Sequence, residues 1–360
     1  MSKNFFNDSN RYGYDYEIAN QMERQLFTAR CLTTYCVENM PYLWAPFLPK
    51  YGLVCLTGES DCGKSAFLMQ LALAVATHEY TNQDEYLGLK FFCNSRGVLY
   101  IATEDVMTSF SVMLNKQCKE LQIDKEQLDK FYILFQFDNI INKIKYIQET
   151  KSVGVIIIDT FNDILSPHNT SIVAVRSVLS KLQFIAEKHK CLIIISHHNH
   201  KKARYNRPSK YDLIGSPAIE AKARAVIELR TDPFEKNIKH LCVVKANYLP
   251  DKYKNKSFLF EFTPQLTFNF LKKVADFDSL TVMPDYISEK VQKYIQLRQE
   301  GVKGDELAKA MGFASRGSLS VWVKKHVKTD GNTTNLYNEL DLNPDNKQDA
   351  EDDNSKKHSN

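Results

Sequence analysis

The sequence predicts an α/β fold, with a doubly wound, mostly parallel sheet that carries helices on both faces and is followed by a small C-terminal helical module. From Gly52 to about Phe270, short runs rich in Val, Ile, Leu, Tyr and Phe alternate with longer helical patterns. This alternation is typical of doubly wound sheets. The central runs are apolar throughout, as expected of parallel strands that are covered by helices on both sides.

The individual elements follow from these patterns. We expect strands at Leu53–Thr57, Gly97–Ala102, Phe131–Phe135, Val153–Asp159, Cys191–Ser196, Ala225–Leu229, Leu241–Lys245 and Phe258–Phe262. We expect helices at Ser65–Glu79, Val106–Leu121, Asn139–Glu149 and Ile172–Lys190. Residues 41–271 therefore form one α/β domain, and residues 1–40 form an N-terminal extension with a helical pattern at Glu17–Cys31.

The C-terminal quarter has a different character. After an expected linker at Lys272–Asp285, helical patterns at Ser288–Gln299, Gly304–Met311 and Arg316–His326 predict a helix-turn-helix or winged-helix-like module over residues 286–328. Residues 329–360 hold eight acidic and three basic residues, which gives this tail a net charge of −5. Since the whole chain has a net charge of +4, the remainder carries +9. The polar tail is expected to be disordered. The basic remainder favours a polyanionic partner, although ordinary surface lysines explain it equally well.

Composition excludes several classes of protein. The hydrophobic fraction of 43% and the charged fraction of 25% are those of a globular protein. The longest apolar runs are too short to span a bilayer, and no secretory signal opens the chain. The eight cysteines are scattered without a C-x-x-C pair or zinc-ligand spacing. We therefore expect a reduced, cytoplasmic location, no membrane partner and no structural metal.

The segment Gly58-Glu59-Ser60-Asp61-Cys62-Gly63-Lys64-Ser65 matches the phosphate-binding pattern G-x-x-x-x-G-K-[ST], the P-loop. It follows an apolar strand and opens an apolar-striped helix, so it is more than a glycine turn before a helix. The two glycines let backbone N–H groups approach the phosphates, and the helix N-terminus adds its dipole. Lys64 is expected to reach the β- and γ-phosphates, and the Ser65 hydroxyl to bind Mg²⁺. ATP and Mg²⁺ are the expected cofactors.

Two further strands end in acids. Asp159 closes an apolar strand about 95 residues after the P-loop, where it is expected to hold Mg²⁺ through water. Alone, such an Asp is often a cap or a turn residue. The strand before Glu104 and Asp105 is expected to lie beside the P-loop strand and to supply the carboxylate that orients the attacking water. Glu104 is the preferred catalyst, because Asp105 better suits an N-cap for the helix at Val106.

In this order, the three elements resemble the RecA-like ATPases, and within them the RepA-like hexameric helicases of plasmids and mobile elements. The resemblance covers about Pro41 to Phe262. It rests on Trp44-x-x-x-Leu48-Pro49, Leu99-Tyr100-Ile101-Ala102-Thr103-Glu104-Asp105, Ser196-His197-His198-Asn199-His200-Lys201, the helix that Gly215-Ser216 opens and that runs to Arg224, and Val243-Val244-Lys245-Ala246-Asn247-Tyr248.

The resemblance implies further roles. His198 matches a sensor position that couples the state of the γ-phosphate to the DNA loop, with a hydrogen-bonded turn histidine as the alternative. Arg224 and Lys245 match positions that reach into a neighbouring subunit's site, which implies a homohexamer. Related helicases often carry Lys-x-Arg where this chain has Lys245-Ala246-Asn247. Asn cannot supply a charge, so the role of the trans cation falls on Arg224 or Lys245.

Candidate nucleic-acid contacts lie in three places. His200–Asp212 holds the bases Lys201, Lys202, Arg204, Arg207 and Lys210, with Tyr205 and Tyr211 interleaved. In RecA-like motors this loop lines the central channel, where bases neutralise phosphates and aromatic rings stack on nucleobases. The alternative is a solvated basic loop. Ser166–Ser171 is a weaker candidate, since Asn169, Thr170 and Ser171 suit helix caps. Ser315–Trp322, with Lys324 and Lys325, resembles a recognition helix, although a protein-interaction module fits nearly as well.

Together these features predict an ATP-hydrolysing, ring-forming single-stranded DNA translocase or helicase of a replication or mobile-element system. One alternative is an ATP-dependent DNA-binding regulator or recombination mediator that does not unwind DNA. The other alternative is a nucleotide-switched interaction protein whose partner is another protein. A basic loop that faces a channel favours the first two readings over the third.

Overall fold

The computed structural model describes residues 28–34, 40–94, 96–135, 138–165, 171–213, 217–281, 285–326 and 338–339. The chain divides into two units, Met1–Pro41 and Tyr42–Asn360. The first contains helix α2 (Ala29–Thr34). The rest of the predicted N-terminal extension, with most of the helical pattern at Glu17–Cys31, lies outside the described residues. So does the acidic tail apart from Asn338–Glu339.

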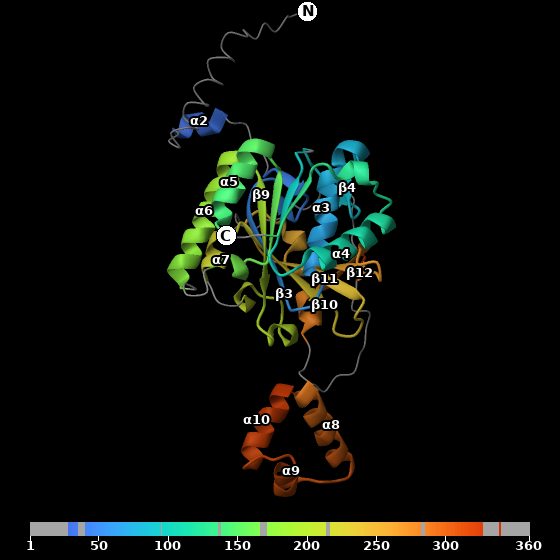
Figure 1. Cartoon of the computed structure of the whole chain (residues 1–360). Helices are drawn as coiled ribbons and strands as arrows, with labels where there is room; N and C mark the ends of the chain where they lie inside the picture. The colour runs from blue at the N-terminus through green and yellow to red at the C-terminus, as the bar shows by residue number, and fades with distance from the viewer. Residues whose placement is uncertain are drawn as a thin grey trace, which may run out of the picture. The chain divides into compact units, whose positions relative to one another are not determined.

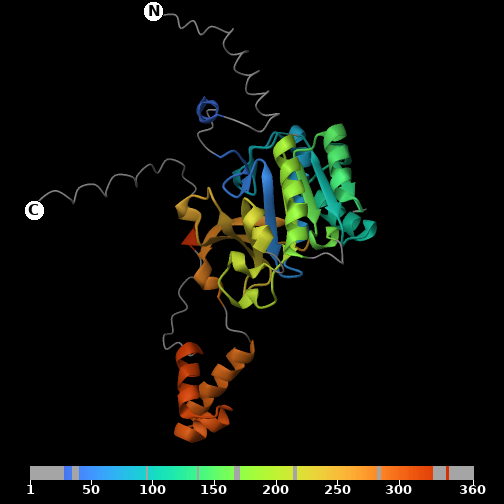
Figure 2. The same cartoon turned by 90° about the vertical axis from the view of Figure 1, so that its left-hand side faces the viewer.

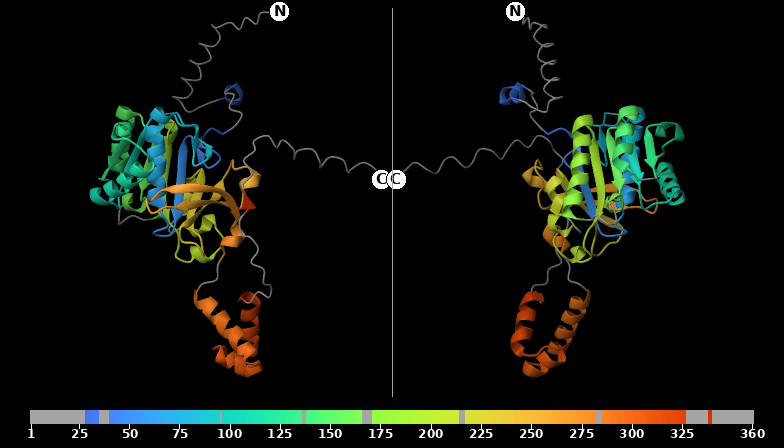
Figure 3. Two further views of the ribbon diagram at one scale, coloured as in Figure 1. Left: turned by 90° about the vertical axis from the view of Figure 1, so that its right-hand side faces the viewer. Right: turned by 60° about the vertical axis from the view of Figure 1, so that its left-hand side comes forward.

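A large sheet organises the second unit (Figure 1). Its order within the described residues is β14-β13-β12-β11-β10-β3-β9-β8-β6-β7. The parallel part consists of β10 (Ala225–Thr231), β3 (Gly52–Gly58), β9 (Leu192–His198), β8 (Val155–Asp159), β6 (Val98–Ala102) and β7 (Phe131–Leu134). The antiparallel part consists of β11 (Ile238–Ala246), β12 (Lys256–Phe262), β13 (Phe268–Asp276) and β14 (Asn338–Glu339). Figure 3 shows the yellow and orange antiparallel strands continuing the sheet. The predicted α/β class with a mostly parallel sheet is confirmed.

Helices cover both faces of the parallel strands (Figures 1 and 2). One face carries α3 (Lys64–Thr81) and α4 (Met107–Glu120), and the other carries α5 (Ile140–Lys151), α6 (Ile172–His189) and α7 (Pro217–Lys222). On β3, Val54 and Leu56 belong to the first core, while Leu53 and Cys55 belong to the second. This period of two is what a strand buried on both faces must show. Two short hairpins complete the unit, β1 (Tyr42–Trp44) with β2 (Leu48–Pro49) and β4 (Glu85–Tyr86) with β5 (Leu89–Lys90).

The structure corrects two predictions about the sheet. The strand before Glu104, β6, does not lie beside the P-loop strand, because β9 and β8 stand between them. The predicted linker at Lys272–Asp285 begins too early, since β13 continues to Asp276 and a short 3₁₀ helix follows at Phe277–Leu280. Phe277 and Leu280 are buried. Lys272 and Lys273 interrupt the apolar pattern of β13, so the sequence gives no continuous apolar run over its second half.

The C-terminal helical module has a core of its own. Its helices are α8 (Asp285–Gln299), α9 (Gly304–Ala310) and α10 (Arg316–His326), close to the predicted bounds. Leu307, Met311 and Leu319 are buried among these helices, and Trp322 packs against them. The three expected helices are therefore present, and the helix-turn-helix or winged-helix-like character of the module stays a prediction. None of the described helices combines the length and the apolar character that a membrane span requires.

Candidate active site

The P-loop connects the end of β3 to the start of α3, and its backbone requires glycine at two positions. A Cβ on Gly58 would lie 2.3 Å from the carbonyl oxygen of Leu229, which is closer than any side chain tolerates. Gly63 has a φ of +100°, in the region that favours glycine. It stands immediately before α3, so the first N–H groups of that helix are open to an anion. The loop therefore has the geometry of a phosphate cradle.

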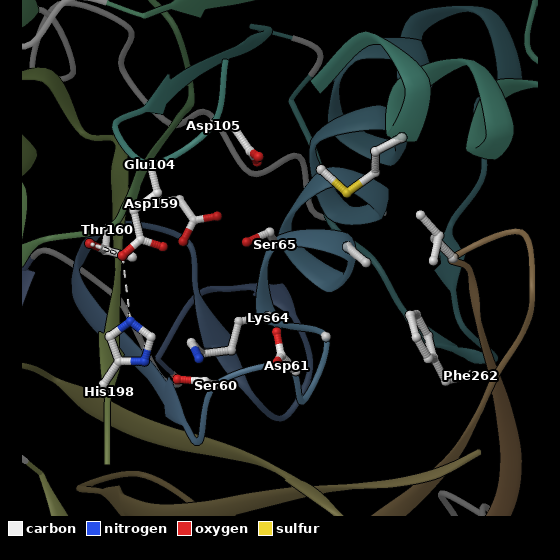
Figure 4. A pocket seen from close by; sticks show the side chains of 14 residues that line it. Ser60, Asp61, Lys64, Ser65, Glu104, Asp105, Asp159, Thr160, His198 and Phe262 are labelled. Carbon is white, nitrogen blue, oxygen red and sulfur yellow. Dashed lines mark hydrogen bonds and ion pairs between the residues drawn. The ribbon is translucent and has the colours of Figure 1, made fainter. Parts of the chain in front are cut away.

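Lys64 extends its side chain back across this loop. The residue is 6% exposed, and its Nζ donates to the carbonyl oxygens of Glu59 at 2.8 Å and Gly58 at 3.3 Å. Lys64 and Ser65 line a cavity of about 600 Å³. Figure 4 shows both side chains between the P-loop and the acids at the ends of β8 and β6. A phosphate bound in the cradle would be within reach of the ammonium group.

Asp159 has the properties of a magnesium-binding carboxylate. It is 6% exposed, and its Oδ2 accepts a hydrogen bond of 2.8 Å from the Tyr100 hydroxyl. Its Oδ1 is buried without a hydrogen-bond partner in the described part of the chain. A buried, unsatisfied carboxylate oxygen is costly unless a ligand completes it. Asp159 and Ser65 line the same cavity, so these residues fit Mg²⁺, which usually takes one or two protein oxygens together with phosphates and water.

Burial and Asp159 act together on Tyr100. Burial raises the pKa of the Tyr100 phenol well above its usual value, and the neighbouring Asp159 carboxylate raises it further. The phenol therefore stays protonated at any working pH and always donates to Asp159. This hydrogen bond fixes the orientation of the carboxylate, and it leaves the second oxygen free for the metal.

Glu104 lies across the cavity from the P-loop, two residues beyond the end of β6. Its Oε1 is 3.4 Å from the Thr160 hydroxyl, which donates to it, and 3.6 Å from His198 Nε2. The side chain is 56% exposed, so a water molecule can approach it. Asp105 also lines the cavity, but its Oδ1 accepts a 2.9 Å hydrogen bond from Ser109. The predicted N-cap role of Asp105 is wrong, since the N-cap of α4 is Val106 and no side chain caps it.

His198 connects the acid to the P-loop strand. It ends β9, where its register partner on β3 is Gly58. Its Nε2 faces Glu104, as Figure 4 shows. Its Nδ1 is buried without a hydrogen-bond partner among the described residues. His198 therefore lies between the first P-loop residue and the candidate base.

The opposite end of the cavity is apolar, and the sequence did not point to it. Met113, Phe262 and Leu266 line this end, which suits the flat face of a nucleobase. Gln70 of α3 holds the β12–β13 hairpin in place, since its Nε2 donates to Phe268 O at 3.1 Å and its Oε1 accepts from Phe268 N at 2.6 Å. The one available signal was that Phe262 closes a predicted strand, but nothing in the pattern indicates where a distant hairpin folds.

The phosphate cradle, the buried carboxylate of Asp159 and the exposed carboxylate of Glu104 therefore meet in one cavity. Residues 30–204 match the family model of an AAA domain. This match supports a P-loop ATPase. No curated protein matches the chain. The matched residues include the P-loop, Glu104, Asp159 and His198, whereas Arg224 and Lys245 lie beyond them.

The two candidate trans cations of this ATPase lie far from its own P-loop along the sheet. Arg224 immediately precedes β10, and its side chain packs against Gly52 at the first residue of β3. Lys245 lies near the end of the antiparallel β11, where it pairs with Val226. Both are therefore at the amino edge of the parallel strands, whereas the P-loop is at the carboxyl edge. Neither cation can complete the site of its own chain.

The two cations differ in what they contact. Lys245 donates to the carbonyl oxygens of Glu220 and Ala223 at the end of α7. Burial lowers its pKa, and the Glu220 carboxylate partly opposes this effect. The guanidinium of Arg224 makes no ion pair or hydrogen bond within the part of the chain that the structure describes. Lys245 thus has a structural task already, and Arg224 is the cation that remains available.

The basic loop begins directly after β9 and contains 3₁₀ turns at Ala203–Tyr205 and Lys210–Asp212. Arg207 forms a 2.9 Å ion pair with Asp278, and Lys210 a 3.0 Å ion pair with Glu220. Three of the predicted DNA-binding bases keep their charge available, because they are exposed and form no ion pair with a described residue: Lys201, Lys202 and Arg204. The weaker candidate Ser166–Ser171 lies outside the described residues except for Ser171, which is the N-cap of α6.

Proposed function

We propose that this ATPase is a ring-forming, single-stranded DNA translocase or helicase of the RepA-like branch, acting in replication or in a mobile-element system. The observation that carries the proposal is the position of His198. One side of this residue faces Glu104 at 3.6 Å, and the basic loop starts two residues later in the chain. A change at the γ-phosphate therefore has a short route to the exposed bases. ATP and Mg²⁺ are the proposed cofactors, held by the P-loop, Ser65 and Asp159.

The proposal of a ring rests on sheet polarity. The P-loop and Arg224 lie at opposite edges of the parallel strands. A chain that uses its neighbour's Arg224 must place its carboxyl edge against the neighbour's amino edge. Such a head-to-tail contact closes only as a ring or continues as a filament. We propose a homohexamer in which Arg224 stabilises charge in the transition state of the adjacent site.

Arg224→Ala alone is expected to reduce ATP hydrolysis by roughly 10³–10⁵, the range for a trans arginine. Mixing it with Lys64→Ala subunits is expected to restore part of the activity. In an equal mixture, about one junction in four pairs an intact P-loop with an intact Arg224. Phosphate release measured across mixing ratios checks this, with Lys222→Ala as a matched control from the same segment. A monomer that reaches full turnover at every protein concentration would contradict the proposal.

DNA contact by the basic loop is tested through salt. The triple variant Lys201→Ala/Lys202→Ala/Arg204→Ala is expected to weaken binding to all single-stranded sequences alike. The slope of log affinity against log salt concentration should also become shallower, by about 0.7 for each phosphate that the variant no longer neutralises. Basal ATP hydrolysis should stay near the wild-type rate, because none of the three residues lines the nucleotide cavity. Fluorescence anisotropy with labelled oligonucleotides at several salt concentrations measures both effects.

The double variant Arg207→Ala/Lys210→Ala is the matched control for that experiment. Asp278 and Glu220 already neutralise these two bases, so the control should change the salt slope less. If the triple variant binds single strands as the wild type does, the loop is not the DNA contact.

The C-terminal module favours a second candidate function. Its separate core makes it a self-contained helical unit, and α10 carries the predicted recognition segment. Loss of DNA binding on deletion of residues 288–328, with an inert basic loop, would favour an ATP-dependent regulator or recombination mediator. A forked-duplex strand-displacement assay, run beside ATPase stimulation by single strands, separates that function from a helicase.

A further inference from the structure

A buried ion pair lies on β10, the strand next to the P-loop strand β3, and one of its members contacts the basic loop. Glu228 and Arg230 are each 3% exposed, and Arg230 NH2 is 2.7 Å from Glu228 Oε1. Arg230 Nε donates to the same oxygen at 2.9 Å. Burial raises the pKa of the Glu228 carboxyl, and the charge of Arg230 counteracts this effect. A charged pair so far from solvent is retained at a cost in desolvation, which calls for an explanation beyond stability.

The remaining donors of Arg230 go to the basic loop. NH1 donates to the carbonyl oxygen of Asn206 at 2.5 Å, and NH2 donates to that of Ala203 at 2.9 Å. These two carbonyls bracket the 3₁₀ turn Ala203–Tyr205, which adjoins Lys201 and Lys202 and contains Arg204. The planar guanidinium can bind two carbonyls and a carboxylate at once, which a lysine ammonium does not match in geometry.

The other end of the connection is at the P-loop. Glu228 is the register partner of Thr57, the last residue before Gly58. The Thr57 hydroxyl donates to Asn199 Oδ1 at 2.5 Å, and Asn199 N donates to Gly58 O at 3.1 Å. Gly58 O also accepts from Lys64 Nζ at 3.3 Å. Asn199, just before the basic loop, is therefore bonded to the start of the P-loop. Strand β10, which neighbours the P-loop strand β3, holds the middle of the basic loop through Arg230.

We propose that Arg230, supported by Glu228, is a positioning residue that presents Lys201, Lys202 and Arg204 to single-stranded DNA and couples their position to the P-loop. The proposal rests on the proposed DNA-stimulated function. Arg230 touches neither nucleotide nor DNA, since it is buried and does not line the cavity. It lowers the entropy cost of DNA binding by holding the backbone between the bases in one conformation.

The test uses Arg230→Lys in the full-length protein, because lysine keeps the charge beside Glu228 but loses the fork. Single-strand affinity is expected to fall about tenfold, which corresponds to the cost of ordering about one side chain or loop segment on binding. ATPase stimulation by single strands should fall with it, while basal hydrolysis stays within about twofold. Hydrogen exchange should accelerate in the peptide over residues 200–206, where Ala203 N, Tyr205 N and Asn206 N are hydrogen-bonded within the loop.

His240→Gln is the matched control. His240 is also buried in this sheet, where it hydrogen-bonds Asp232 at 2.8 Å and Ser257 at 3.0 Å. This variant should lower the melting temperature without altering DNA response. The proposal is overturned if Arg230→Lys keeps wild-type affinity and stimulation, or if His240→Gln loses them equally.

Two further measurements keep the test decisive. If Arg230→Lys does not fold, the double variant Glu228→Gln/Arg230→Leu removes both charges of the pair, so neither partner is left buried alone, and it should show the same loss of DNA response. Wild-type protein that neither binds nor responds to single strands overturns the proposed function itself. Wild-type response with an equal response in the variants overturns only the role of Arg230.

Discussion

Replacing Lys64 by Ala is expected to lower ATP hydrolysis by at least roughly 10²–10³, the effect of losing a group that stabilises transition-state charge. Lys64 is the only lysine or arginine among the described residues that line the cavity, so no other described lysine or arginine of the cavity wall takes its place. The fold should persist, because the side chain bonds only to the carbonyls of Gly58 and Glu59. Phosphate release with ATP and Mg²⁺ measures the effect.

Lys90→Ala is the control for this variant, since Lys90 is an exposed lysine paired with Asp84 on the surface. Comparable melting temperatures for the two variants and the wild type would show that any loss is local. Near-wild-type turnover by purified Lys64→Ala protein would remove the assignment of the nucleotide site.

Glu104→Gln is expected to bind ATP normally and to hydrolyse it roughly 10²–10⁴ times more slowly. The amide keeps the shape and the contact with Thr160 but loses the negative charge that orients water. ATP affinity should survive, because the P-loop and not Glu104 holds the phosphates. Equilibrium binding of a fluorescent ATP analogue, followed by single-turnover hydrolysis, separates the two effects.

Asp105→Asn provides the comparison, because both acids line the cavity. Asp105 accepts a hydrogen bond from Ser109 at the start of α4, so its replacement should affect this helix turn more than turnover. If Asp105→Asn traps ATP and Glu104→Gln turns over normally, the roles of the two acids are reversed.

Local patterns were sufficient for the parallel strands and for the phosphate cradle. The apolar runs around Leu53 and Val155 predict buried strands because burial on both faces leaves no room for polar side chains. Gly58 and Gly63 could be assigned because a P-loop imposes its backbone conformation over eight consecutive positions. The positions of Glu104 and Asp159 followed from a general rule, since parallel strands carry their ligands at the carboxyl edge.

Features that depend on strand order or on distant pairings could not be predicted. No local signal places β9 and β8 between β3 and β6, since strand order is decided by how the crossover helices pack. The ion pairs of Arg207 and Lys210 join residues that are 71 and 10 positions apart. A basic stretch in the sequence therefore overstated the charge that remains available. Glu228 interrupts the apolar pattern of the predicted strand Ala225–Leu229 and Arg230 lies just beyond it, so the partners of both became visible only in the fold.

The pairing of Gln70 with Phe268 divides the nucleotide site into two mechanical parts. The amide of Gln70 both donates to and accepts from the Phe268 backbone, as an adjacent strand would, so the hairpin that carries Phe262 is fastened to the helix that carries Lys64. The spacing between the base wall and the phosphate cradle is therefore fixed before any nucleotide arrives. Glu104 and His198 belong to chain segments that this fastening does not include. We therefore expect nucleotide affinity to depend on this fastened pair of elements, and the rate of hydrolysis to depend on Glu104 and His198.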